Sequence, residues 1–445
     1  MVVLIKTLQV ILALSLLILI HELGHFTFAK IFGIRVDKFF LFFDIGGTKL
    51  FSTKGRFFTK LCPKAKDWNT EYGIGWLPLG GYCKINGMVD ESLDLDSLKG
   101  EPKSWEFRSK KPWKRLLVMA GGVLYNFIFA ILAYILILSI WGQSYIKNDG
   151  NAIYVNELSY EMGFRTGDRI IAFDDYVPEN FGMLQADLAR RNVRKVKLLR
   201  GADTLDLYID QAMMGKVLNT PGMFSLAVPF VISGLTDNSV NSGADLREGD
   251  RIVSVDGVKV DYVQDARPLL SSRAGGSVLA GLVRDGESVE MQLQVDSLGM
   301  IGVSTVIPGI EVKDYNFFSA IPAGFALTFS TIGGYLRDLR LVADPGTQAY
   351  KSVGSFIAIG QVFPGNWDWY QFIEILALLS IMLGVMNLIP IPGLDGGHIV
   401  ITLYEMITGR KPGEKFLVIS QMIGMALLLL LMFLAFGNDI GRLIK

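Results

Sequence analysis

The sequence has little charge: only 19% of its 445 residues are Asp, Glu, Lys or Arg, against about 25% in a typical soluble domain. The deficit is local, because three long stretches carry no charge at all: 116–146, 375–394 and 416–436. Each stretch reaches the roughly 20 apolar residues that an α-helix needs to cross a bilayer. A wholly soluble protein is therefore excluded.

A fourth uncharged stretch, 7–20, follows Lys6 and runs directly into His21. It begins like the hydrophobic part of a signal peptide, but no small-x-small cleavage site follows it. We therefore expect it to be retained as a first membrane span. A fifth uncharged stretch, 317–336, is rich in Gly, Ser and Thr.

The sequence also lacks a net charge, since 43 Lys and Arg balance 43 Asp and Glu. Nothing therefore favours nucleic acid as a partner. The charges are unevenly placed: segment 30–115 has 17 basic and 10 acidic residues, and segment 147–314 has 17 and 24. Because basic residues concentrate on the cytoplasmic side of membrane spans, we expect 30–115 to be cytoplasmic and 147–314 to lie on the opposite face.

Cysteine is almost absent. Cys62 and Cys83 are the only two, and both fall in the segment expected to be cytoplasmic. The segment on the opposite face therefore has no disulfide to stabilise it. A zinc ribbon is also excluded, because no further Cys or nearby His completes four ligands.

An internal repeat organises segment 147–314. The run 167–174 (GDRIIAFD) recurs 82 residues later as 249–256 (GDRIVSVD), and each run reads as a strand that ends at a turn. The repeat predicts two β-rich modules, 148–215 and 225–312. Both resemble PDZ domains, which bind extended peptides at a sheet edge. The alternative is that they serve only as a spacer or a steric plug.

Histidine is also scarce. The chain has three, and two of them lie in His21-Glu22-Leu23-Gly24-His25. Positions i and i+4 lie on one face of a helix, so both imidazoles can bind one metal ion. Zinc is the expected ion, and Glu22 can take a proton from the attacking water without binding the metal. A chance HExxH at a polar helix end is the alternative. However, three ionisable residues against an apolar span are costly without a function.

A catalytic zinc needs a third protein ligand. The third span ends in the run 387–398 (NLIPIPGLDGGH), where two prolines and a glycine interrupt the helix. Such interruption at membrane depth is tolerated only where the backbone is buried in protein or lines a water-filled cavity. Asp395 or His398 could supply the ligand. Alternatively, Asp395 caps the next helix and His398 lies at the membrane interface.

Together, HELGH in the first span and NxxPxPxLDG far downstream resemble the site-2 protease family of intramembrane zinc metalloproteases. The two PDZ-like modules between the second and third spans narrow the resemblance to the regulator of sigma-E protease branch, and it covers essentially the whole chain. The resemblance implies that Zn²⁺ is bound by His21, His25 and Asp395, with Glu22 as the catalytic base. It also implies a multi-pass protein of the bacterial inner membrane with the modules on the periplasmic side.

The resemblance also suggests where substrate binds. Segment 73–82 (GIGWLPLGGY) resembles a membrane-dipping β-loop that offers a strand edge, and Pro78 suits an edge strand. A plain buried hairpin is the alternative. Asn126 in the second span could be either a site residue or a helix-packing residue. The residues expected to contact substrate are Gly75, Leu79, Gly80, Gly81, Asn126, Asn387, Pro390 and Pro392.

The number of membrane crossings follows from the direction in which each span must run. The first span runs inward and carries HExxH to the cytoplasmic half, so the third span must also run inward to bring Asp395 to that depth. A crossing by 317–336 would reverse the third span. We therefore expect 317–336 and 350–364 to be interfacial or re-entrant segments.

The predicted fold is a polytopic α-helical membrane protein with four transmembrane helices and two β-rich PDZ-like domains inserted between helices two and three. The expected regions are 1–147 with HExxH and the β-loop, 148–215, 225–312, an interfacial segment 313–368, and 369–445 with the LDG motif.

The predicted activity is cleavage of the transmembrane segments of single-span membrane proteins, such as anti-sigma factors or remnant signal peptides, after another protease has removed the ectodomain. The modules would contact peptides or ectodomains, or filter substrates by size. The alternatives are a membrane-anchored scaffold without peptidase activity and a metal transporter. Glu22 favours the enzyme, because neither alternative needs a base between the two histidines.

Overall fold

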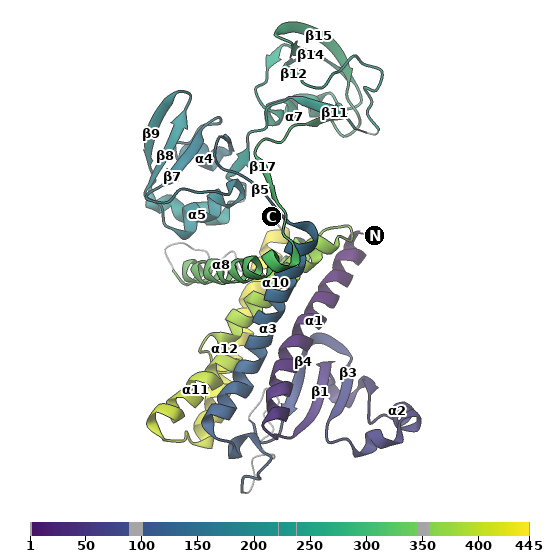
Figure 1. Ribbon diagram of the computed structural model, residues 1–445, viewed down its shortest axis with the longest axis vertical. Helices are drawn as coiled ribbons and strands as arrows, with labels where there is room; N and C mark the ends of the chain where they lie inside the picture. Colours follow the sequence, from purple (N-terminus) through teal and green to yellow (C-terminus); the bar gives the residue numbers. More distant parts are fainter. Residues whose placement is uncertain are drawn as a thin grey trace. The chain divides into compact units, whose positions relative to one another are not determined.

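The structure, a computed structural model, describes residues 2–88, 101–220, 222–236, 238–344, 354 and 356–444. These residues form two compact units. One is mainly helical and contains the chain before 142 and most of the chain after 314; the other is rich in strands and comprises Gln143–Lys313. The second unit is thus inserted between helices α3 (Pro112–Trp141) and α8 (Phe317–Ala343) of the first (Figure 1).

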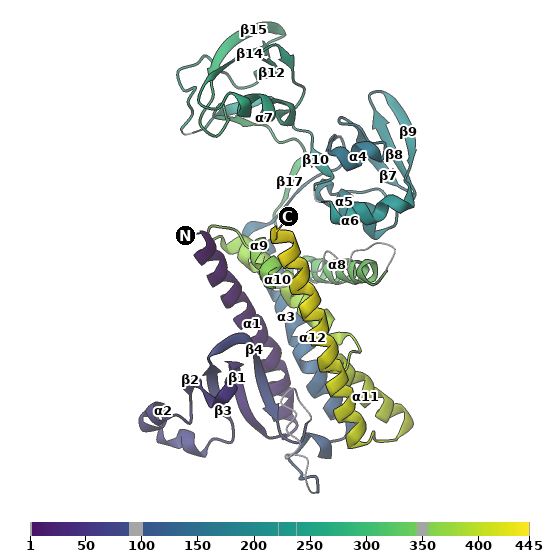
Figure 2. The ribbon, with the colours of Figure 1, turned by 180° about the vertical axis from the view of Figure 1, so that it is seen from behind.

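Five helices are long and apolar enough to cross a membrane, by length and composition. They are α1 (Val2–Ile31), α3, α8, α10 (Trp369–Leu388) and α12 (Glu414–Ile444). Four of them run along the long direction of the helical unit, whereas α8 lies across it in both views (Figures 1 and 2). The contact of α8 with α3 is close, because Gly324 leaves room for Ile135.

Two shorter helices complete the helical unit. Helix α9 (Phe356–Val362) falls in segment 350–364, of which 350–353 and 355 lie outside the described residues. Helix α11 (Asp395–Thr408) begins within the proline-rich run that follows α10. A helix after Asp395 was considered from the sequence only as the one that Asp395 could cap, and α11, with 14 residues, is too short for a span. Its end carries a clear signal, since Gly409 has φ 69° and closes the helix in the left-handed conformation.

Glycines bring α1 and α3 unusually close together. A Cβ atom on Gly24 would collide with the backbone carbonyl of Gly121, and one on Gly121 would lie 2.7 Å from the carbonyl oxygen of Gly24. Small residues at a helix crossing allow the two backbones to approach, which is how helices associate in membranes. This crossing fixes the half of α1 that carries the two histidines.

A four-stranded sheet follows α1. Its strand order is β2 (Lys49–Ser52), β3 (Glu71–Gly75), β1 (Val36–Phe43) and β4 (Leu77–Ile85). The pair β1 and β3 is parallel and the other two pairs are antiparallel. The expected β-loop is thus not a hairpin, because β1 lies between β3 and β4, and β4 forms one edge of the sheet. A short helix, α2 (Arg56–Leu61), connects β2 to β3.

The strand-rich unit contains two modules with the same arrangement of three antiparallel strands. In the first module these are β7 (Arg169–Phe173), β8 (Lys195–Arg200) and β9 (Asp203–Tyr208). In the second they are β12 (Arg251–Val255), β14 (Ser277–Arg284) and β15 (Glu287–Gln294), with β13 (Val258–Lys259) beside β12. Each module has its own core of buried apolar side chains.

Shorter elements close each module. The first contains β6 (Ile153–Val155), α4 (Glu157–Glu161), α5 (Leu184–Arg190), α6 (Met214–Asn219) and β10 (Phe224–Leu226). The second contains β11 (Ile232–Leu235), α7 (Val263–Ser272) and β16 (Val303–Thr305). Because β10 pairs with β6 and packs on the first core, the first module reaches Leu226, beyond the expected boundary at 215.

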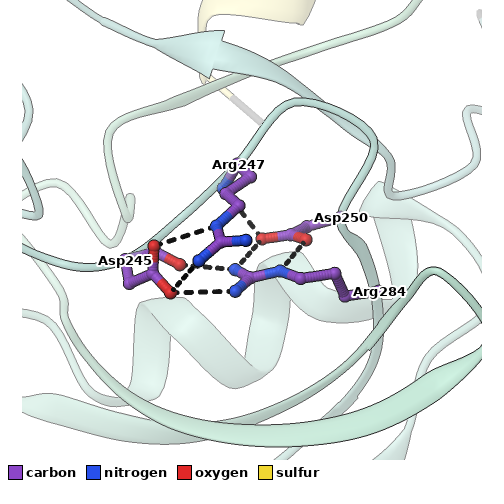
Figure 3. Close-up of polar contacts among 4 residues, drawn as sticks. All are labelled: Asp245, Arg247, Asp250 and Arg284. Carbon is purple, nitrogen blue, oxygen red and sulfur yellow. Dashed lines mark hydrogen bonds and ion pairs between the residues drawn. The ribbon is translucent and has the colours of Figure 1, made fainter.

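The repeated Gly-Asp turn has a structural reason. In the second module, Asp250 accepts two hydrogen bonds of 2.7 Å from Arg284 and one of 2.9 Å from the backbone N–H of Arg247 (Figure 3). In the first, Asp168 accepts two of 2.8 Å from Arg200 and one of 2.8 Å from a backbone N–H. Both carboxylates are almost fully buried. The repeat therefore encodes a buried, fully paired carboxylate that ties a turn to a strand.

The two ends of the insertion are held together. Strand β5 (Gln143–Ile146), where the chain leaves α3, pairs with β17 (Ile310–Lys313), just before α8. The pair brings the start and end of a long insertion side by side. The helical unit can thus accept the two modules without separating α3 from α8.

Candidate metal centre

The two histidines of HExxH lie on one face of α1, one helical turn apart. His21 is 9% exposed and His25 is 6% exposed, and their ring centroids are 4.8 Å apart with the rings nearly perpendicular. The Nε2 atoms of the two rings are 3.2 Å apart. A continuous helix through the motif therefore aims both imidazole nitrogens at one point.

Asp395 reaches the histidines because α10 stops early. The chain leaves the helix at Leu388, forms a compact loop and restarts as α11 at Asp395. The loop and the start of α11 are tightly packed: a Cβ on Gly396 would collide with the carbonyl oxygen of Ile389, and one on Gly397 would lie 2.7 Å from that of Ile391. The LDGG run is thus needed to fold the carboxylate back toward α1.

The three side chains form the group that best fits a metal ion among the described residues. The Oδ2 atom of Asp395 lies 3.2 Å from His21 Nε2 and 3.3 Å from His25 Nε2. Ligands 2.0–2.1 Å from a tetrahedral zinc ion are about 3.3–3.4 Å from each other, by simple geometry. The three observed separations match the edges of such a tetrahedron.

The protonation of the site also fits a cation. His25 Nδ1 lies 2.8 Å from the carbonyl oxygen of Val118, which can only accept, so Nδ1 carries the proton and a neutral ring has a bare Nε2. Asp395 Oδ2 is buried and has no hydrogen-bond partner among the described residues. Two lone pairs facing each other at this distance repel unless a cation lies between them. The residues present therefore fit a zinc ion.

Helix α3 forms the wall behind the histidines. A Cβ on Gly122 would lie 2.6 Å from both His21 Cε1 and His25 Nε2, so only glycine leaves room for the two rings. One turn further along α3, the amide of Asn126 lies 3.1 Å from His21 Nδ1. The sequence analysis missed the roles of Val118 and Gly122, because neither a backbone carbonyl nor a single glycine carries a motif.

Glu22 lies beside the metal-binding group and is partly exposed. Its carboxylate accepts a hydrogen bond from the backbone N–H of Cys83 in strand β4. The edge strand of the sheet therefore touches the residue expected to act as the base. Cys62 and Cys83 form no disulfide within the described part of the chain.

The residues expected to bind substrate fall into two groups. Asn387, at the end of α10, has its Nδ2 atom 3.5 Å from His21 Nε2, and Pro390 and Pro392 lie in the loop that leads to Asp395. The other group lies on the sheet: Gly75 ends β3, and Leu79, Gly80 and Gly81 lie on β4.

The glycines of the sheet allow close contacts. A Cβ on Gly81 would lie 2.7 Å from Ile18 of α1, and one on Gly80 would collide with the ring of Phe43. The edge strand therefore runs close along α1, one turn before the histidines. His398 lies on α11 and is not part of the metal-binding group described above.

Two buried imidazoles and a carboxylate around one point, with a second carboxylate beside them, fit the ligand set and the base that a zinc peptidase needs. The comparisons with known proteins agree with this class. The chain belongs to peptidase family M50, whose sequence model matches residues 9–431, and it is a zinc metalloprotease.

The named relatives are similar to the chain over nearly its whole length. The chain is 30% identical to the regulator of sigma-E protease RseP of Escherichia coli (strain K12), and 29% identical to RseP of Salmonella typhimurium (strain 14028s / SGSC 2262). It is 27% identical to a protein of Vibrio cholerae serotype O1 whose name describes a zinc metalloprotease. Each comparison covers 97% of this chain and 98% of the relative.

Proposed function

We propose that the protein hydrolyses a peptide bond within the transmembrane segment of single-span membrane proteins, after another protease has removed the ectodomain. The observation that carries the proposal is the triangle of His21, His25 and Asp395, whose ligand atoms are 3.2–3.3 Å apart. These residues belong to, or directly follow, helices apolar enough to cross a bilayer. Chemistry built into such helices acts on substrates that are themselves in the membrane.

His21, His25 and Asp395 would hold Zn²⁺, which supplies Lewis acidity to polarise the scissile carbonyl and to make water a stronger acid. Glu22 takes the proton from the attacking water as the new C–O bond forms. It then delivers that proton to the nitrogen of the leaving amine as the C–N bond breaks. The low exposure of His21 and His25 limits the access of bulk water to the site.

A helical substrate must unwind before its carbonyl can be attacked, because helical hydrogen bonds occupy the backbone. Edge strand β4 supports this step, since an extended backbone can add to a sheet edge. The Cys83 N–H at Glu22 links the same strand to the base. Asn387 lies near the ligand atoms, and its side chain can both donate to and accept from the extended substrate.

The proposed topology has four spans: α1, α3, α10 and α12. It places α8 at the membrane interface, in keeping with its position across the other helices (Figure 1). Segment 30–115 would lie in the cytoplasm of a bacterium, with the two modules on the periplasmic side of its inner membrane. The names of the RseP relatives describe a regulator of sigma-E, which supports a role in sigma-factor regulation. The proposed substrate is anti-sigma-factor-like, and the proposed role is in stress signalling.

The two modules are proposed to be PDZ-like and to control access to the site. The repeated strand arrangement supports a common fold for both. They would either bind an extended peptide at a sheet edge or exclude substrates that still carry a large ectodomain. Both roles serve the same protease, and neither changes the chemistry at Glu22.

The experiment compares wild type with Glu22→Gln on a single-span membrane protein that lacks its ectodomain, with zinc measured in both proteins. We expect Glu22→Gln to keep about one zinc per chain and to lose about 100-fold to 10,000-fold in cleavage rate, the range for a general base. Equal rates for the two proteins would refute Glu22 as the base. Absence of zinc from both would refute the metal centre itself.

A further inference from the structure

Each histidine of the metal centre has a second ring nitrogen, and α3 faces both of them. We propose that Asn126 is a positioning residue: its amide oxygen accepts a hydrogen bond from the Nδ1–H of His21 and so fixes this ring to bind metal through Nε2. The inference rests on the proposed metal centre and deepens it. It assigns Asn126 to the second layer of the site rather than to substrate contact.

The partner of His25 sets the pattern. Its Nδ1 donates to the carbonyl oxygen of Val118 at 2.8 Å, which leaves Nε2 available to a metal. Histidines that bind metals almost always donate their other N–H to a carbonyl, carboxylate or water, and this contact fixes both tautomer and ring orientation. His21 needs an acceptor of the same kind at its own Nδ1.

The two helices bring that acceptor to the right place. They run antiparallel, so His25 meets Val118, both rings meet Gly122, and His21 meets Asn126, in steps of four residues along each helix. The side chain of Asn126 is fully buried. Its backbone carbonyl also accepts a hydrogen bond of 2.9 Å from Ser380 of α10, which holds this turn of α3 in place.

The amide of Asn126 can present either its nitrogen or its oxygen to His21. With Nδ2 turned toward the ring, at 3.1 Å, Oδ1 is buried without a hydrogen-bond partner among the described residues. The nitrogen and oxygen of an amide have nearly the same shape, so their assignment follows from the hydrogen bonds they make. Rotating the amide by half a turn gives His21 an acceptor and gives both histidines the same tautomer. In either orientation one end of the amide has no partner among the described residues, so the choice rests on the tautomer that metal binding through Nε2 requires of His21.

The test measures zinc affinity of the purified full-length protein by competition with a chelator. The variants are Asn126→Leu, which cannot accept a hydrogen bond, and Asn126→Asp, which can. We expect Asn126→Leu to bind zinc about 10-fold to 100-fold more weakly, as second-layer changes do. Asn126→Asp should stay within about threefold of wild type, because a carboxylate still accepts from Nδ1.

A matched control is Ser380→Ala, which removes a buried contact with the same turn of α3 but leaves the amide of Asn126 in place. It should leave zinc affinity unchanged. Wild-type affinity in Asn126→Leu would overturn the proposal, and so would an Asn126→Asp protein as weak as Asn126→Leu, since only packing would then matter. A wild type that binds no zinc would instead refute the proposed metal centre.

If Asn126→Leu does not fold, nitrogen NMR of the zinc-loaded wild type gives the answer. The chain has only three histidines, so replacing His398 leaves the signals of His21 and His25, and the proposal requires both rings to carry their proton on Nδ1. A proton on Nδ1 of His21 supports the bond to the amide oxygen. A bare Nδ1 overturns it.

Discussion

The helical unit and the strand-rich unit each contain aspartates with buried carboxylate oxygens, but the two units treat them in opposite ways. In the modules, the carboxylates of Asp168 and Asp250 each accept three hydrogen bonds, two of them from an arginine. In the helical unit, Asp395 turns toward two imidazoles an oxygen that has no hydrogen-bond partner within the described part of the chain. A buried carboxylate with its partners in place serves the fold. A carboxylate oxygen without a proton donor can instead bind a cation.

The comparison predicts that the two kinds of aspartate respond differently to removal of their charge. Replacing Asp395 by Asn removes an anionic ligand, so we expect zinc affinity to fall by at least about 1,000-fold and cleavage to be lost. The metal-free variant should be close in stability to metal-free wild type, because an Asn oxygen at this position can still accept a hydrogen bond from an imidazole. Zinc content and thermal unfolding of both apo-proteins check this.

A drop in the apo-protein's unfolding temperature would contradict the comparison, since Asp395 would then support the fold as Asp250 does. The matched control is Asp439→Asn in α12, also a buried aspartate of the helical unit. It lies outside the metal-binding group, so zinc content should not change.

Asp250→Ala should destabilise the second module and leave zinc binding unchanged. It leaves the guanidinium of Arg284 without its main partner and breaks a buried ion pair, a change that costs about 3 kcal/mol or more. We expect amide hydrogen exchange in β12 and β14 to become about 100-fold faster or more, with no change at the metal centre. Asp245→Ala is the control, because Asp245 belongs to the same network but is exposed (Figure 3).

The sequence predicted one part of each unit. His21, Glu22 and His25 form a local motif, and the periodicity of one helix is enough to place both rings on the same face. The modules follow from a repeat that shows itself at an offset of 82 residues. Both signals act within a short stretch of chain, and that is why the sequence reveals them.

Contacts between distant segments are harder to read. The pairing of β1 with β4 and the restart of the chain as α11 depend on how separate segments pack. A signal for β1 exists, since its second part, Phe39–Phe43, is an apolar run, but a short apolar run does not distinguish a strand from a helix. The carbonyl of Val118 carries no side-chain signal at all. Only the folded chain shows that α3 supplies the second layer of the site.

A substitution at Gly122 tests this contribution of α3, because Gly122 belongs to no motif yet lies against both histidines. In Gly122→Ala the new methyl group would lie 2.6 Å from each ring, so the rings must shift apart or turn. We expect zinc affinity about 10-fold to 30-fold weaker than wild type, measured by chelator competition. Gly437→Ala in α12, where nothing lies within 4 Å, is the control and should bind zinc normally. Unchanged affinity in Gly122→Ala would mean that α3 can move away from the two rings at little cost in free energy.

The smallest effect concerns pH and the second module. The hydrogen bonds from Arg284 lower the pKa of Asp250 below its usual value of about 3.9. A carboxyl group with a lowered pKa in the folded state stabilises the module fully above its unfolded pKa and loses this contribution as the pH falls through the folded value. We therefore expect hydrogen exchange in β12 and β14 to show progressively less protection below about pH 4. In Arg284→Met the pKa returns toward normal, so this part of the acid dependence should disappear. An acid profile that is the same in Arg284→Met would show that Asp250 is not the group that titrates.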